Sequence, residues 1–378
     1  MSDRGGARGI ARRAKRIVVK VGSSILTDAG ALRQRVFSEL ARQVSALADD
    51  GREVVLVSSG AIAIGSRKLG WSHPGRSMEE KQAAAAVGQV GLMELYQKRF
   101  AKHRRHVAQV LVTRSGLEDR GGFLNARRTL LALLRLGVVP VVNENDTVAT
   151  EEIRFGDNDN LSATILNVVE GDLLILLTDV EGLYQSPPEE GEPTPPLFDV
   201  VQEITPAILE AAQGSRHAFG RGGMTTKLEA ARSAAHSGAG TVVCSGAAKD
   251  ALVRVAKGEP VGTLFLPGKR LGSRKHWLAF TTQPKGVLVL DDGAAKAVRE
   301  RGRSLLAAGV VEVRGRFGMG DAVSCVDSTG REIARGLASY GAAEVERLKG
   351  RSTREIAAVL GYFNGDAVIH RDDLVLVS

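Results

Sequence analysis

The residues with the clearest chemical potential lie between residues 143 and 163, in the sequence NENDTVATEEIRFGDNDNLSA. This stretch holds four asparagines and three aspartates, and it follows an apolar run, residues 138–142, that is typical of a buried strand. Loops at the carboxyl ends of parallel strands are the usual ligand sites of α/β proteins. Asparagine and aspartate are also common in solvated turns, so the stretch alone leaves both interpretations open.

A lysine and two glycine-containing turns indicate an anionic ligand. Lys20 lies in the apolar segment 17–21, where an unpaired ammonium group is costly to bury, and the sequence Gly-Ser-Ser follows it. Ser59 and Gly60 follow a second apolar segment, 54–57, in the same way. Such turns let backbone N–H groups approach a phosphate at a helix N-terminus. A surface lysine on an edge strand and a simple helix cap are the alternatives.

A third glycine-rich segment, 221–227 (RGGMTTK), precedes a predicted helix. It lacks the GxxxxGK[ST] spacing of a Walker loop, and it suits either a phosphate lid or a flexible hinge. Together, the turns, the two lysines Lys20 and Lys227 and the polar loop favour phosphoryl transfer, which depends on positioning and charge neutralisation. A carboxylate acceptor would need no general base, because a pKa of about 4.3 leaves it ionised at pH 7. The seven histidines show no metal-ligand spacing.

The elements expected to position these groups alternate between strands and helices over residues 17–266. The predicted strands cover residues 17–21, 54–57, 107–112, 138–142, 173–177 and 241–244, and the main predicted helices cover residues 33–48, 79–105, 123–136, 161–169 and 225–236. This alternation predicts an α/β fold, a three-layer αβα sandwich around an open, mainly parallel sheet. The polar loops after the first, second, fourth and fifth strands would then meet on one edge of that sheet.

Length and composition predict two domains and two basic connections. We expect residues 1–16 (net charge +5) to form a disordered arm, residues 17–266 (−2) the α/β domain, residues 267–285 (+5) a linker, and residues 286–378 (0) a small β-rich barrel. The net charge of +8 therefore lies outside both folded bodies, which weakens a nucleic-acid interpretation. No apolar run reaches about 18 residues, so no transmembrane helix is expected. Two cysteines and the lack of a secretion signal suit the cytoplasm.

The ordered motifs resemble those of the glutamate 5-kinase family, within the amino-acid kinase superfamily. They are VVKVGSS, VVLVSSGAIAIG, LVTRSGLEDR with FLNAR, VPVVNENDTVAT, FGDNDNLSA, LLTDVEGLY and GGMTTKLEAA, and they extend from about Ile17 to Phe265. The last part of the chain, with GRFGMGDAVSCVD and VIHRDDL, looks like a PUA domain. Other members of the superfamily phosphorylate different carboxylates or phosphates, and fold alone does not choose among them.

The resemblance implies ATP-dependent phosphorylation of the γ-carboxylate of L-glutamate, the first step towards proline, with Mg²⁺ entering on ATP. It implies that Lys20 and Lys227 neutralise the transferring phosphoryl group and that Asp159 orients them. The implied glutamate-binding residues are Ser59, Gly60, Asn143, Asp146 and Asn158; the implied ATP-binding residues are Lys20, Thr178, Asp179, Arg221, Gly222, Gly223, Met224, Thr225, Thr226 and Lys227. Direct protein ligands of the metal are not implied.

The family resemblance also implies a cytoplasmic homo-oligomer, with the next enzyme of proline synthesis as a possible partner. Arg221 departs from the family pattern, where a small residue such as threonine is expected before GGM, and the basic arm lies outside the pattern. An RNA-binding protein acting through the PUA-like domain is the alternative of a different class. The zero net charge of residues 286–378 argues against it, and we expect a structural or regulatory role for this domain.

Overall fold

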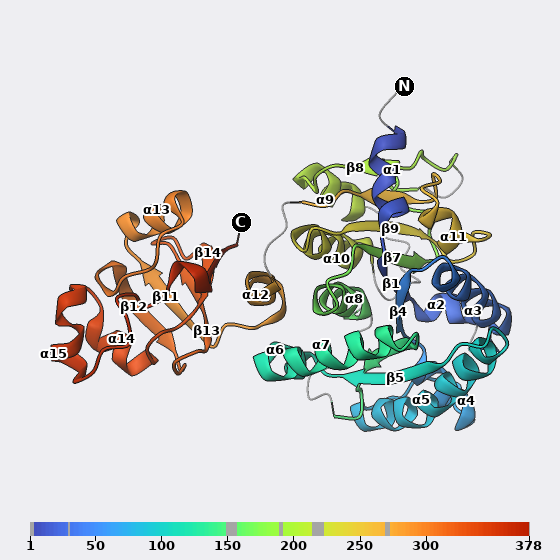
Figure 1. The fold of residues 1–378 in the computed structure, drawn as a ribbon, viewed down its shortest axis with the longest axis horizontal. Helices are drawn as coiled ribbons and strands as arrows, with labels where there is room; N and C mark the ends of the chain where they lie inside the picture. Colours follow the sequence, from blue (N-terminus) through green and yellow to red (C-terminus); the bar gives the residue numbers. More distant parts are fainter. Residues whose placement is uncertain are drawn as a thin grey trace. The chain divides into compact units, whose positions relative to one another are not determined.

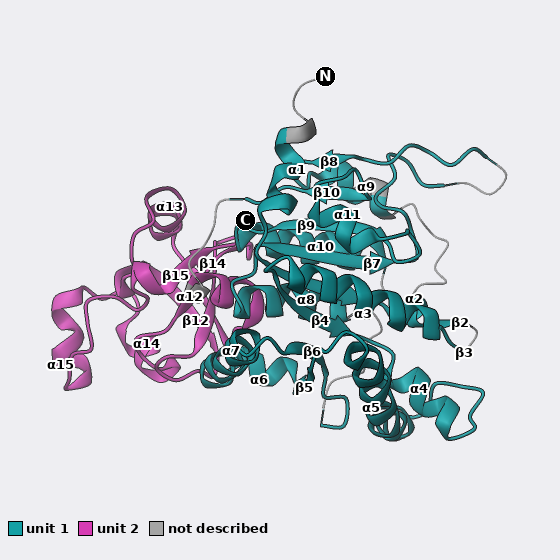
Figure 2. Cartoon of the chain, turned by 45° about the vertical axis from the view of Figure 1, so that its right-hand side comes forward, with its two compact units in different colours: residues 1–271 teal, residues 272–378 magenta. Residues whose placement is uncertain are grey.

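The computed structural model describes residues 4–28, 31–148, 157–188, 192–213, 223–268 and 273–377. The chain divides into two compact units, Met1–Leu271 and Gly272–Ser378, which Figure 2 distinguishes by colour. Among the described residues no helix is both long enough and apolar enough to cross a membrane. Each unit has its own sheet and its own hydrophobic core.

An eight-stranded sheet runs through the first unit. In spatial order its strands are β5 (Val107–Val112), β6 (Val139–Glu144), β4 (Glu53–Ser58), β1 (Arg16–Val21), β7 (Leu173–Thr178), β9 (Gly240–Ser245), β10 (Thr263–Phe265) and β8 (Val200–Val201). Every neighbouring pair is parallel except β9 and β10. The expected mainly parallel α/β sheet is confirmed, and all six predicted strands are present.

Helices cover both faces of this sheet, because the central strands are apolar on both sides. One face packs against α3 (Gln34–Asp49), α5 (Met78–Ala101) and α11 (Ala251–Ala256), whose buried residues form one cluster with Ile17, Val19 and Val21. The other face packs against α7 (Arg120–Arg135), α8 (Asp157–Val168) and α10 (Met224–His236). Figure 1 shows these two helical layers on opposite sides of the strands, as the three-layer prediction requires.

Shorter elements complete the first unit. They are α2 (Ser23–Leu26), β2 (Thr27–Asp28), β3 (Ala31–Leu32), α4 (Ala61–Lys68), α6 (Arg114–Glu118) and α9 (Pro206–Gln213). Helix α4 lies against the long helix α5, and this is the most extensive contact between any two elements. The turn after β4 is therefore backed by a pair of tightly packed helices.

The expectation of a disordered arm over residues 1–16 is wrong for its described part, residues 4–16. Residues Arg4–Arg13 form helix α1, and the Arg8 side chain is buried in the first unit. Its guanidinium group forms an ion pair with Asp199 at 2.6 Å and donates to the backbone carbonyls of Asp199, Glu259, Val261 and Gly262. Four carbonyls and a carboxylate thus replace the water that a buried guanidinium loses.

The second unit contains a five-stranded sheet with short helices around it. Its strands, in spatial order, are β12 (Val310–Gly315), β11 (Gly286–Leu290), β13 (Ala322–Val326), β14 (Glu332–Leu337) and β15 (Leu374–Leu376); its helices are α12 (Ser273–His276), α13 (Asp292–Arg301), α14 (Ala342–Leu348) and α15 (Ile356–Leu360), with 3₁₀ turns at Ala307–Gly309, Thr353–Glu355 and Arg371–Asp373. The expected small β-rich domain is confirmed.

The expected linker, residues 267–285, is structured over residues 273–285. Helix α12 continues into a π-helical turn, Trp277–Thr281, in which Trp277 and Leu278 are buried. This turn contacts β14 and β15, and Arg335 of β14 donates to the carbonyl oxygen of Ala279 at 3.1 Å. The basic composition of the segment obscured the apolar residues that anchor it to the second unit.

Candidate active site

The candidate site lies where four neighbouring strands end. The strands β6, β4, β1 and β7 are adjacent and parallel, so their carboxyl ends point to one edge of the sheet. Asn143 is the second-last residue of β6. Ser59 directly follows β4, Gly22 follows β1, and Asp179 follows β7. Segments that are distant in the sequence therefore meet at a single edge, as expected for a ligand site in an α/β sheet.

At this edge two lysines share one carboxylate. The Nζ atom of Lys20 lies 2.7 Å from Oδ1 of Asp159, and the Nζ atom of Lys227 lies 3.3 Å from Oδ2 of the same side chain. The hydroxyl group of Thr226 also donates to Oδ2, at 2.8 Å. The Asp159 side chain is fully buried, and both lysine side chains are at least nine-tenths buried. The structure therefore brings together the three residues that the sequence analysis singled out as catalytic candidates.

The alternation of side chains along β1 explains the direction of Lys20. Ile17, Val19 and Val21 pack in the cluster that contains α3, α5 and α11, so Lys20 projects from the opposite face of the sheet. Helices α8 and α10 contact each other on that face. Asp159 lies in the first turn of α8 and Lys227 in the first turn of α10, so two helix N-termini and a strand end converge on one point.

Positive charge is concentrated at this point. Within the part of the chain that the structure describes, two buried ammonium groups share the Asp159 carboxylate, and Asp179 also acts on Lys227 through its charge. Burial would raise the pKa of Asp159, but the two ammonium groups outweigh it and hold that pKa below its ordinary value. Burial lowers the pKa of Lys227, and repulsion by Lys20 adds to this effect, while Asp159 opposes it. A phosphate group is the kind of ligand that such a site would stabilise.

A chain of amide hydrogen bonds extends from this centre. The Nδ2 atom of Asn158, next to Asp159, donates to Oγ of Ser59 at 2.7 Å and to Oδ1 of Asn143 at 3.2 Å. The Nδ2 atom of Asn143 donates in turn to Oε1 of Gln89 at 3.0 Å. Residues of α8, β6, α5 and the turn after β4 are thereby linked in one polar network.

The turn after β4 is fixed from both sides. Gly60 has φ 105°, a left-handed conformation that glycine adopts at little cost, and helix α4 begins directly after it. The backbone N–H of Ser59 donates to the carbonyl oxygen of Val21 at 3.1 Å. The buried hydroxyl groups of Ser58 and Tyr96 lie 2.8 Å apart, which ties the strand end to α5. The Ser59 hydroxyl is therefore held on a rigid support.

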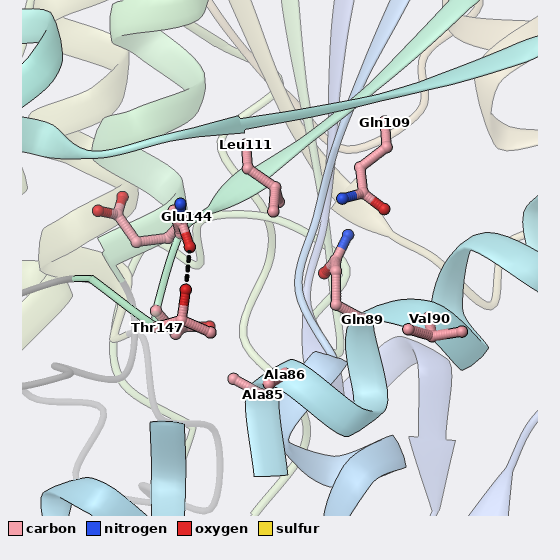
Figure 3. Close-up of a pocket in the computed structure, with 10 residues that line it drawn as sticks. Ala85, Ala86, Gln89, Val90, Gln109, Leu111, Glu144 and Thr147 are labelled. Atoms are coloured by element: carbon pink, nitrogen blue, oxygen red, sulfur yellow. Dashed lines mark hydrogen bonds between the residues drawn. The ribbon is translucent and has the colours of Figure 1, made fainter. Parts of the chain in front are cut away.

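Beyond Asn143, a cavity of about 250 Å³ lies between α5, β5 and the turn after β6 (Figure 3). Its lining includes Gln89, Gln109, Glu144 and Asp146. Burial raises the pKa of Asp146 to about 6, because the carboxylate loses hydration. No hydrogen bond or ion pair from a described residue offsets this loss. A cationic ligand group in this cavity would restore the ionised carboxylate.

The predicted nucleotide-binding residues lie at the end of β7 and the start of α10. Strand β7 flanks β1, the strand of Lys20, on the side opposite β4. Thr178 ends β7, and its hydroxyl group donates to Oδ1 of Asp179 at 3.0 Å. Gly223 caps the N-terminus of α10, and Met224, Thr225 and Thr226 form its first turn with Lys227. Arg221 and Gly222 lie outside the described residues. Among the residues that the structure describes, no group of three His, Cys, Asp or Glu side chains could hold a metal ion.

Comparison with known proteins agrees with this geometry. The amino acid kinase family matches residues 15–245, and the PUA domain matches residues 286–360. The glutamate 5-kinase of Paraburkholderia phymatum is 49% identical over 98% of this chain and 100% of its own length, and that of Burkholderia mallei is 50% identical over the same shares. The solved structure of UMP kinase from Bacillus anthracis aligns with 68% of this chain and 97% of its own chain, at 15% identity and a TM-score of 0.46.

The chain belongs to the amino acid kinase family, in its glutamate 5-kinase branch. The described residues of this kinase's candidate site lie at one edge of the sheet.

Sequence reasoning missed two contributors to the site of this amino acid kinase. Gln89 of α5 joins the amide network, and Tyr96 of the same helix supports Ser58. The signal for Gln89 was a single polar residue among small ones, in AAAAVGQVG. Thr226, expected to contact nucleotide, also holds the Asp159 carboxylate.

Proposed function

We propose that this protein transfers the γ-phosphoryl group of ATP to the γ-carboxylate of L-glutamate. The observation that carries the proposal is the buried Asp159 carboxylate between the ammonium groups of Lys20 and Lys227. In the reaction, an oxygen of the acceptor carboxylate bonds to the γ-phosphorus, and the bond between that phosphorus and the bridging oxygen of ADP breaks. The acceptor is already ionised at neutral pH, so the site needs no general base.

Lys20 and Lys227 would stabilise the negative charge that moves from the acceptor side to the leaving group during transfer. Fixed charges in a buried site are effective here, because they need little reorganisation when the charge shifts. Asp159 and Thr226 would keep the two ammonium groups apart and pointed at the phosphoryl group. The two buried ammonium groups favour this role, since a phosphate group would interact favourably with both.

The amide network would hold the acceptor. Ser59 and Asn158 lie next to the charged centre and would contact the γ-carboxylate, with the Gly60 turn and Asn143 beside them. Asp146 lines the adjoining cavity and would hold the α-ammonium group of glutamate. Pairing with that cation would offset the burial that raises the pKa of Asp146.

ATP would enter as its Mg²⁺ complex, along β7 and the N-terminus of α10. Thr178, Asp179 and the loop 221–227 are the proposed nucleotide contacts. Mg²⁺ is commonly held by phosphates and water with few protein ligands, which suits a site without a cluster of three metal-binding side chains among the described residues.

The direct test is release of ADP by the purified protein with Mg²⁺, ATP and one acceptor at a time. We expect turnover with L-glutamate and little with L-aspartate or N-acetyl-L-glutamate. L-Aspartate is one methylene shorter, and acetylation removes the cation that Asp146 would hold. Turnover with either alternative acceptor and none with L-glutamate would reject the proposal in favour of another carboxylate kinase of this fold.

We further propose that the protein acts in the cytoplasm and assembles with copies of itself. Both cysteines, Cys244 and Cys325, are buried and unpaired, which suits a reducing compartment. Association with the next enzyme of proline synthesis is a further prediction of the resemblance. Sedimentation of the purified protein, alone and mixed with that enzyme, tests both forms of assembly.

A further inference from the structure

The side chain of Gln89 reaches the substrate cavity from helix α5. It is only 8% exposed. Its Oε1 atom accepts from Asn143. Its Nε2 atom has no hydrogen-bond partner among the described residues, although it too is buried.

The hydrogen-bond network sets the orientation of this amide. The Asn143 side chain accepts from Asn158 through Oδ1, so its Nδ2 atom is the group that faces Gln89. Gln89 must then present Oε1 to Asn143 and turn Nε2 away from it. Figure 3 shows the Gln89 side chain at the cavity, with its nitrogen pointing between α5 and β5 toward Gln109.

A buried N–H group without an acceptor is rare in folded proteins and is destabilising. When such a group lines a cavity at a substrate site, a ligand acceptor is a natural partner. The remaining cavity wall carries Asp146 and Glu144, which attract a cation, whereas Gln89 offers a donor. A ligand that carries an ammonium group next to a carboxylate could pair with the acidic side chains and also accept the hydrogen bond from Gln89.

We infer that Gln89 is a specificity-determining residue whose Nε2 donates a hydrogen bond to the α-carboxylate of the acceptor amino acid. This inference rests on the proposed function, since it assigns the end of L-glutamate that does not react. The network supports the assignment: Ser59 and Asn158 lie beside the phosphoryl centre, and Gln89 lies on the other side of Asn143. In L-glutamate, the α-carboxylate likewise lies at the end of the molecule away from the reacting γ-carboxylate.

The same geometry predicts how the acceptor could be switched. In Gln89→Glu the side chain keeps its size and can still accept from Asn143, but a carboxylate oxygen replaces the donor. That oxygen repels an α-carboxylate and accepts from an α-carboxamide. L-Isoglutamine, which carries a carboxamide at that position and keeps the reacting γ-carboxylate, should therefore suit the variant.

The test compares kcat/KM for L-glutamate and L-isoglutamine in four proteins: wild type, Gln89→Glu, Gln89→Met and the control Gln97→Glu. Gln97 is exposed on the same helix, so the control carries the same change of charge away from the site. We expect Gln89→Glu to raise KM for L-glutamate about 10- to 100-fold, which is the usual effect of a lost hydrogen bond to a charged group. The KM for ATP should stay unchanged, and the ratio of kcat/KM for L-isoglutamine over L-glutamate should rise about 100-fold.

A purely structural Gln89 gives a different result. If Gln89 only supports Asn143, then Gln89→Glu keeps a near-wild-type KM for L-glutamate, because the acceptor oxygen is retained, and only Gln89→Met is impaired. That pattern, or an unchanged preference between the two acceptors, would overturn the inference. Lack of ADP release by the wild-type protein with L-glutamate would instead reject the proposed function itself.

Discussion

Gly65 of α4 and Gly88 of α5 meet so closely that neither position has room for a side chain. A Cβ atom on Gly65 would lie 1.7 Å from the carbonyl oxygen of Ala84, and one on Gly88 would lie 1.7 Å from that of Ala61. Helix α4 begins at the Gly60 turn, and Gln89 follows Gly88 on α5. This contact therefore sets the distance between two sides of the substrate site.

Replacing Gly65 with alanine should separate these helices. Alanine normally favours a helix by about 1 kcal/mol over glycine, but here the added methyl group meets backbone atoms that cannot rotate away. We expect Gly65→Ala to lower the free energy of unfolding by about 2 kcal/mol, a typical result of overpacking, and to raise KM for L-glutamate more than KM for ATP. Urea denaturation and initial rates measure these effects.

Gly9→Ala in helix α1 is the matched control. A Cβ atom there would meet only the flexible end of Arg13, at 3.0 Å, so this variant should be as stable as the wild type or more stable. Equal effects of the two substitutions would show that helix propensity, and not the α4–α5 contact, decides the outcome at Gly65.

Asp159→Asn should cost both activity and stability. It removes the counter-charge of two buried ammonium groups, and the pKa of Lys227, already lowered by burial, should fall further. Loss of one partner from a buried ion pair commonly costs about 3–5 kcal/mol. Inorganic phosphate should therefore raise the melting temperature of this variant more than that of the wild type. An equal response to phosphate in both proteins would contradict the charge assignment.

Lys227→Met should separate activity from stability. We expect kcat to fall about 10²–10³-fold, because a charge that stabilises the transition state is removed. The native protein should nevertheless lose less stability than it does in Asp159→Asn, since Asp159 keeps the ammonium group of Lys20 and the donor from Thr226. Enzyme assay and chemical denaturation of the same sample check both statements. Near-wild-type kcat would remove Lys227 from the mechanism.

The sequence predicts the centre of this molecule better than its ends. The strands around Lys20 are continuous apolar runs, and their order as parallel neighbours follows from strand–helix alternation. The meeting of Lys20 with Asp159 follows from that topology and from the resemblance. In each case the local pattern and the long-range packing agree.

The ends were mispredicted because their structure depends on partners that are distant in the sequence. Residues 4–13 are rich in glycine and arginine, a poor composition for an isolated helix. What stabilises α1 is the set of carbonyls around Arg8, contributed by residues near 199 and 259–262. Gln89 was missed for the same reason, since only the folded chain brings it to Asn143.

Arg8→Met should therefore destabilise the first unit. It leaves the aliphatic packing in place but removes the ion pair with Asp199 and the donors to four backbone carbonyls. We expect a loss of about 2–4 kcal/mol in the free energy of unfolding. Arg12→Met, a change of the same type at an exposed position of α1, should have an effect below about 0.5 kcal/mol. Similar melting curves for both variants would restore the interpretation of a disordered arm.

The raised pKa of Asp146 predicts how glutamate binding depends on pH. Burial places this pKa at about 6, so the carboxyl group of the free protein is protonated below that value. The α-ammonium group of L-glutamate then lacks its counter-charge, and kcat/KM for L-glutamate should fall about tenfold per pH unit below pH 6. At saturating L-glutamate, kcat should depend less on pH, because the bound cation lowers the pKa of Asp146. Initial rates between pH 5 and 8 measure both profiles.

Asp146→Asn tests this assignment through stability as well as activity. The variant should have a low kcat/KM for L-glutamate without the fall near pH 6. In the wild type, the unfolded chain ionises this residue near pH 3.8 but the native protein only near 6, so the native state binds more protons between these values. The wild type therefore loses stability as pH rises through this window, on the order of 2–3 kcal/mol by pH 7, and the amide does not. The variant should match the wild type below pH 4 and exceed it at pH 7, whereas a constant difference in stability across this range would show that Asp146 is not the titrating group.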